Sequence, residues 1–174
     1  MQRYTKTAIF FHWLIALMII GAFTMGLVMT DIPGITPTKL KYYSWHKWAG
    51  MTILALACLR LLWRLSHRAP AYPASMPVWQ RQAASVLHLG LYALIFAVPV
   101  SGYFYTLSAG IPVVYFGLWQ LPVLIEKNAE LKPVLKEVHF WLNMLLAAGV
   151  GAHVAAALKH HFIDRDGVLQ RMLP

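Results

Sequence analysis

The sequence predicts an all-α fold, a bundle of four helices that cross a membrane, built as a single domain from residues 1–174. Hydrophobic residues make up 59% of the 174 residues and charged residues only 12%, a composition typical of integral membrane proteins. Four stretches reach the length of about 20 apolar residues that a hydrocarbon core requires. The charged residues gather near the ends of these stretches and between them.

The four helices are expected at residues 8–29, 44–65, 83–107 and 133–162. The first has a basic flank like that of a signal peptide. Its apolar core is longer, however, and no clear small-residue cleavage site follows, so we interpret it as a retained helix. The third contains Pro99, which lacks a backbone donor and should bend the helix. That bend either serves packing alone or widens a pocket beside a cofactor.

The connections are expected to be loops rather than domains. The first, on the outer side, is a short turn with proline and glycine, and the second, on the inner side, is rich in proline. Residues 111–125 are apolar but contain two prolines and a glycine and are too short to span the bilayer. They are expected at the outer interface, either as a lid over what lies beneath or as an aromatic-rich loop at headgroup level.

The distribution of basic residues predicts the orientation in the membrane. Placing the N-terminus inside collects nine basic residues on the inner side and six on the outer side. The inner set is Arg3, Lys6, Arg60, Arg64, Arg68, Arg81, Lys159, Arg165 and Arg171, and the outer set is Lys39, Lys41, Lys47, Lys127, Lys132 and Lys136. Both termini are therefore expected in the cytoplasm. The sequence has a net charge of +9 but no compact basic domain that could bind nucleic acid. The expected partner is therefore a lipid bilayer and not nucleic acid.

Histidines in the expected helices are candidate ligands, because ionisable side chains inside a membrane are costly and usually functional. His12 and His153 are expected at one level near the inner surface, and His46 and His139 at one level near the outer surface. His139 and His153 share a helix face and lie about 21 Å apart along it. A haem held by two histidines needs rings from different helices at one depth. The pattern therefore predicts two haems with the fourth helix serving both.

Two further observations bear on that hypothesis. Cys58 is the only cysteine, which excludes a C-x-x-C-H site for covalent haem. His88 lies about 12 Å from the inner end of the third helix, so it could replace His12, form a hydrogen bond within the bundle, or serve proton transfer near a quinone. Spacing leaves these alternatives open.

Small residues near the histidines fit a large flat macrocycle, since they let it approach the backbone. Gly50 follows His46 by four residues, and Gly149 and Gly151 precede His153 by four and two. The alternative is ordinary packing of membrane helices through small residues.

Basic residues could bind the haem propionates. Arg60 and Arg64 lie one helical turn apart, where they could clamp a propionate of the inner haem or simply anchor the helix at the inner surface. Lys47 could serve the outer haem in the same way.

Several motifs together resemble the bacterial cytochrome b561 family: FHWL, HKWAG, PVSGY, FGL and the C-terminal AHVAAALKHHFIDRDGVLQRMLP. The resemblance runs over nearly the whole chain. It implies a multi-pass protein of the bacterial inner membrane with two non-covalent haems b that exchange electrons with the quinone pool. It also implies His12 and His153 as ligands of the inner haem and His46 and His139 of the outer one, which favours His12 over His88.

For the small stand-alone branch of this family, the resemblance implies oxidation of superoxide with ubiquinone as the electron acceptor. Lys39, Lys41 and Lys47 gather near the expected outer mouth and could steer an anion, or they are ordinary loop lysines. The alternative function is an electron-transfer subunit for a partner dehydrogenase, hydrogenase or reductase, because the cytochrome b subunits of such enzymes share a similar ligand plan.

Overall fold

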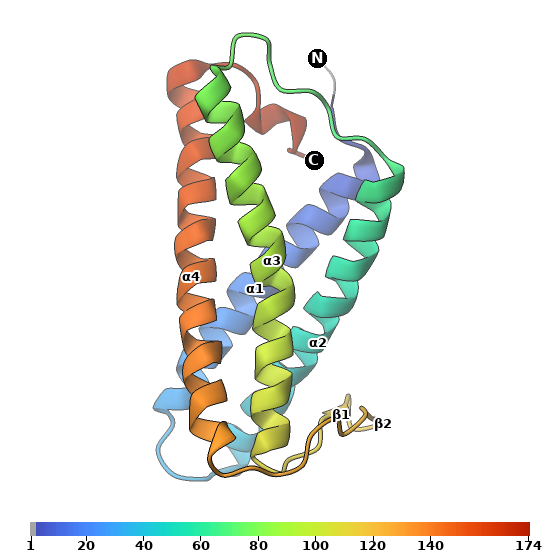
Figure 1. Ribbon diagram of the computed structural model, residues 1–174, viewed down its shortest axis with the longest axis vertical. Helices are drawn as coiled ribbons and strands as arrows, with labels where there is room; N and C mark the ends of the chain where they lie inside the picture. Colours follow the sequence, from blue (N-terminus) through green and yellow to red (C-terminus); the bar gives the residue numbers. More distant parts are fainter. Residues whose placement is uncertain (1–2) are drawn as a thin grey trace.

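A computed structural model describes residues 3–174 and contains four long helices, so the predicted fold class is confirmed (Figure 1). They are α1 (Lys6–Asp31), α2 (Pro37–Ser66), α3 (Val78–Ser108) and α4 (Leu131–Lys159). All four are long and apolar enough to cross a membrane. Helix α3 continues through Pro99, as membrane bundles allow.

All four helices begin before their expected apolar windows, and at α1 and α2 a polar N-cap stabilises the added first turn. The side chain of Thr5 accepts a hydrogen bond from the backbone of Ala8 at the start of α1, at 3.3 Å. Thr36 does the same for Lys39 at 3.1 Å, and Pro37 occupies the first turn of α2. Such N-caps satisfy backbone donors that the helix leaves unpaired. The predictions counted apolar residues and so missed these polar first turns.

Helix α1 packs closely against α2, and α3 packs closely against α4. Contacts between α2 and α3 join these two pairs into one bundle. Helices α1 and α4 scarcely contact each other. The few buried apolar side chains, such as Ile15, Ile53 and Leu146, lie between the helices, whereas large apolar side chains are widely exposed on the outside. An apolar exterior is what a bundle in lipid requires.

The two ends of the bundle differ (Figure 1). The end that carries both chain termini and the α2–α3 connection is called the terminal end here. The other, the hairpin end, carries a small hairpin of β1 (Val114–Tyr115) and β2 (Trp119–Gln120), which pair antiparallel. The apolar stretch 111–125 thus contains a hairpin and no spanning helix.

The C-terminal segment closes the terminal end. After α4 the chain forms a π-helical turn, His160–Asp164, and a short 3-10 helix, Leu169–Arg171. Arg171 Nη1 donates to the carbonyl of Ala71 at 2.5 Å, and Trp13 Nε1 donates to the carbonyl of Met172 at 2.8 Å. The tail therefore fastens α1 and the α2–α3 connection to each other.

Candidate functional site

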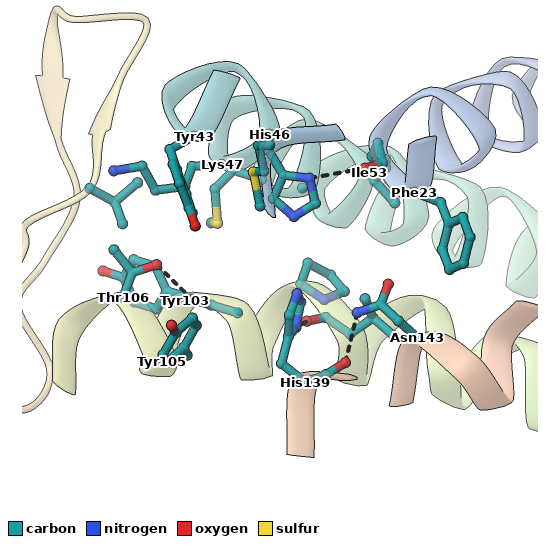
Figure 2. A pocket seen from close by; sticks show the side chains of 18 of the residues that line it. Phe23, Tyr43, His46, Lys47, Ile53, Tyr103, Tyr105, Thr106, His139 and Asn143 are labelled. Carbon is teal, nitrogen blue, oxygen red and sulfur yellow. Dashed lines mark hydrogen bonds between the residues drawn. The ribbon is translucent and has the colours of Figure 1, made fainter. Parts of the chain in front are cut away.

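A cavity of about 750 Å³ lies between the helices toward the hairpin end. All four helices line it, and most of the lining is apolar, for example Phe23 of α1 and Ile53 of α2 (Figure 2). A few polar groups join them, among them Tyr43 of α2 and Asn143 of α4. Its volume lies in the range of about 300–1,000 Å³ that is typical of cofactor and ligand pockets.

His46 of α2 and His139 of α4 point toward each other across this cavity (Figure 2). Their ring centroids are 6.3 Å apart, and the ring planes are nearly perpendicular, at 86°. The structure thus brings together the two histidines that were predicted to share the outer level.

Hydrogen bonds define the tautomer of both rings. His46 Nδ1 lies 3.0 Å from the carbonyl oxygen of Ala22, and His139 Nδ1 lies 3.1 Å from that of Val98. Because a carbonyl oxygen only accepts, each Nδ1 carries the proton, which leaves a free lone pair on each Nε2. Ser101 Oγ is a second partner of His139 Nδ1 at 3.0 Å and itself donates to Val98 at 2.8 Å. This is the arrangement that orients metal-binding histidines.

Two glycines make room for these rings. A Cβ atom at Gly102 would lie 2.8 Å from His139 Cε1, and one at Gly26 would lie 3.4 Å from His46 Cε1. From the sequence, Gly102 was noted only within the motif PVSGY, and Gly26 was not noted. The side chain that lies opposite a given glycine depends on how neighbouring helices are rotated and shifted relative to each other. A single sequence does not specify this arrangement.

The three glycines that were predicted to let a haem approach the backbone have different surroundings. Gly50 lines the cavity, and a Cβ atom there would lie 3.9 Å from Pro99 Cβ. A Cβ atom at Gly149 would lie 3.1 Å from Leu91 Cδ2 of α3, a contact that favours helix packing, and a Cβ atom at Gly151 would meet nothing within 4 Å.

Three histidines from three helices meet toward the terminal end. The ring centroids of His12 (α1) and His153 (α4) are 6.1 Å apart, and those of His88 (α3) and His153 are 5.3 Å apart. Among residues 3–174, no protein group lies within hydrogen-bonding distance of the buried His12 Nδ1. A buried polar atom without a protein partner requires an explanation, and a role in holding a cofactor is one.

The predicted propionate ligands Arg60 and Arg64 lie near this cluster. Both guanidinium groups lie over the ring of Tyr92, at 5.4 and 5.6 Å from its centroid, which holds them at the terminal end by cation–π contacts. They also line a small pocket of about 40 Å³ with Trp63.

The predicted steering lysines separate into two groups. Lys39 and Lys47 line the cavity, and so does Lys132, which the sequence placed only among the basic residues of the outer side. The ammonium of Lys39 donates to the carbonyl of Ile32 at 2.7 Å. Lys41 instead lies over the ring of Trp45, 4.7 Å from its centroid.

Comparison with known proteins identifies the architecture. Residues 3–174 match the family model described as prokaryotic cytochrome b561. The chain belongs to the prokaryotic cytochrome b561 family. Among its relatives, cytochrome b561 homolog 2 of Escherichia coli is 34% identical, over 99% of this chain and 92% of the relative. The probable superoxide oxidase CybB of Yersinia pestis is 31% identical, over 99% of this chain and 97% of that protein.

Membership of the cytochrome b561 family implies haem b and electron transfer in a bacterial membrane, and the histidine geometry fits a haem. Imidazole–metal bonds of about 2.0–2.1 Å on both sides of one ion place the ring centroids about 6 Å apart. The pairs His46–His139 at 6.3 Å and His12–His153 at 6.1 Å match this spacing. The pair His88–His153 is closer, at 5.3 Å, so the spacing favours His12 over His88 as the partner of His153.

The substitution Gly102→Ala is expected to lower haem binding at the hairpin end. Its Cβ would lie 2.8 Å from His139 Cε1, and overpacking of this kind costs about 1–3 kcal/mol when the neighbour must move. Haem absorbance per chain and thermal unfolding measure the effect. Gly90→Ala is the matched control, because it lies on the same helix and its Cβ would meet nothing within 4 Å. Equal haem content in both variants would contradict the role of Gly102.

Proposed function

We propose that this cytochrome b561 is a superoxide:ubiquinone oxidoreductase with two haems b, one at each end of the bundle. The main observation behind this proposal is the presence of two histidine pairs whose spacing suits two ligands of one iron. Their ring centroids are 6.3 Å apart at the hairpin end and 6.1 Å apart at the terminal end. Helix α4 contributes one ligand to each pair. We propose that His46 and His139 bind one haem iron and that His12 and His153 bind the other.

The proposed orientation places both termini in the cytoplasm and the hairpin end on the outer face. It is supported by the excess of basic residues at the terminal end, nine against six. The His46–His139 pair then lies toward the outer surface of the bacterial inner membrane.

Bound haem supplies reversible one-electron chemistry, and the chain supplies ligands, orientation and charge. The Nδ1 hydrogen bonds to Ala22 and Val98 hold His46 and His139 with Nε2 free for iron. At the other end, Arg60 and Arg64 are held over Tyr92, where each can offer a guanidinium to a propionate.

The superoxide assignment is supported by the cationic wall of the cavity and by the relative named probable superoxide oxidase. Each superoxide anion loses one electron and becomes O₂, and ubiquinone takes up two electrons and two protons to become ubiquinol. Two superoxide anions are therefore consumed for each quinone. Lys39, Lys47 and Lys132 are placed to attract this anion toward the cavity.

The purified single chain is expected to have its haem reduced by superoxide and reoxidised by added ubiquinone. Lys132→Gln should slow the reduction about threefold at low ionic strength and weaken its salt dependence, since steering by charge is screened by salt. Stopped-flow absorbance of the haem measures both. Lys6→Gln removes the same charge at the terminal end and should leave the rate unchanged.

Failure of superoxide to reduce the haem of an otherwise intact protein would contradict the enzymatic proposal. Reduction only in the presence of a partner dehydrogenase, hydrogenase or reductase would instead establish the alternative function, an electron-transfer subunit.

A further inference from the structure

The stretch 111–125, called the hairpin segment here, exposes apolar side chains that neither haem site uses. None of its fifteen residues is charged. At its tip Leu118 is 90% exposed, Trp119 76% and Phe116 56%. Large apolar side chains exposed side by side usually mark a contact surface.

The hairpin segment is fixed to the bundle. Trp48 Nε1 donates to the carbonyl of Val114 at 2.7 Å, and Thr52 Oγ1 lies 2.7 Å from the hydroxyl of Tyr115. On the other side, the hydroxyl of Tyr103 donates to the carbonyl of Pro122. Attachment to both α2 and α3 means that the tip holds a defined position relative to the helices.

That position lies beside α2 and not beyond its end. Trp48 and Thr52 come 11 and 15 residues after Pro37, about 16 and 22 Å along α2 from its first residue. Figure 1 shows the hairpin beside the lower end of α2 rather than beyond it. A protein partner in the aqueous phase would meet the ends of the helices first, whereas a surface beside a spanning helix meets lipid.

We propose that the hairpin segment inserts into the bilayer leaflet at the hairpin end, with Phe116, Leu118 and Trp119 among the lipid headgroups and upper acyl chains. The absence of charge favours lipid over a polar interface, and aromatic side chains are enriched at this depth of a membrane. Lipid contact also has a consequence for the cavity. Val113, only 1% exposed, and Ile111 belong to its lining, so the inserted hairpin holds one wall of the cavity in place.

Spin labelling tests the proposal on the full-length chain in nanodiscs of phosphatidylcholine and phosphatidylglycerol. Cys58 is first replaced by serine, since it is the only cysteine, and a nitroxide is attached to Leu118→Cys. Ala129→Cys is the matched control, because Ala129 is exposed in the polar loop just before α4. Collision rates with oxygen, which concentrates in lipid, and with a polar nickel chelate are measured by power saturation.

The proposal predicts an oxygen-to-nickel ratio several-fold higher at residue 118 than at residue 129. Equal ratios would place the tip in water and overturn it. Protection of residue 118 from both reagents would also overturn it, because the tip would then be covered by protein, such as a second copy of the chain. Unchanged haem absorbance and elution volume verify the fold. Trp119→Cys, labelled in the same way, is a second position at which the same ratio is expected.

Discussion

Replacing His139 by alanine is expected to reduce the haem content of the purified chain from two haems to one. The substitution removes one of the two imidazoles at the hairpin end, which lie 6.3 Å apart, and leaves His46 without an opposing ligand. The terminal-end haem should remain, because His153 lies about 21 Å farther along α4. The change is measured as the amount of haem per protein chain. A redox titration should also show one redox component fewer than in the wild type.

Two controls separate ligand loss from general damage. His67→Ala removes a histidine of the α2–α3 connection that stacks on Trp63 with 3.8 Å between ring centroids, and it should retain both haems. Free imidazole added to His139→Ala should restore part of the missing haem, since it supplies the lost nitrogen. Retention of both haems in untreated His139→Ala would refute the assignment.

At the terminal end, His12→Ala is expected to lose one haem, whereas His88→Ala should keep both. The structure brings both rings close to His153, and the 6.1 Å separation of His12 is nearer than the 5.3 Å separation of His88 to the spacing of two imidazoles that hold one iron. Haem content and the low-temperature electron paramagnetic resonance spectrum of the oxidised protein distinguish the two variants. The opposite pattern, in which His88→Ala loses a haem and His12→Ala does not, would make His88 the ligand.

The positions of the histidines along each helix follow from the sequence, because an α-helix has a constant rise and period. Counting from the ends of the apolar windows was therefore enough to predict that His12 and His153 share one level and His46 and His139 another. The same counting left His88 as a rival, and the structure indeed places it 5.3 Å from His153.

Contacts between helices did not follow from the sequence. Gly102 and Gly26 make room for the two histidines of the cavity, and Ser101 bonds to His139, but each depends on how neighbouring helices are rotated. For Gly149 the spacing left both a cofactor contact and helix packing open, and the structure places the Leu91 side chain of α3 beside it. The hairpin was also not predicted, because hydrophobicity indicates an interfacial position for residues 111–125 but does not specify their backbone conformation.

The most direct test of the two-site account is a pyridine haemochrome assay on the detergent-purified, haem-sufficient wild-type chain, referenced to protein concentration. The account predicts two haems b per chain, one for each histidine pair. One haem per chain would contradict one of the two pairs, and no haem would contradict the electron-transfer function built on them.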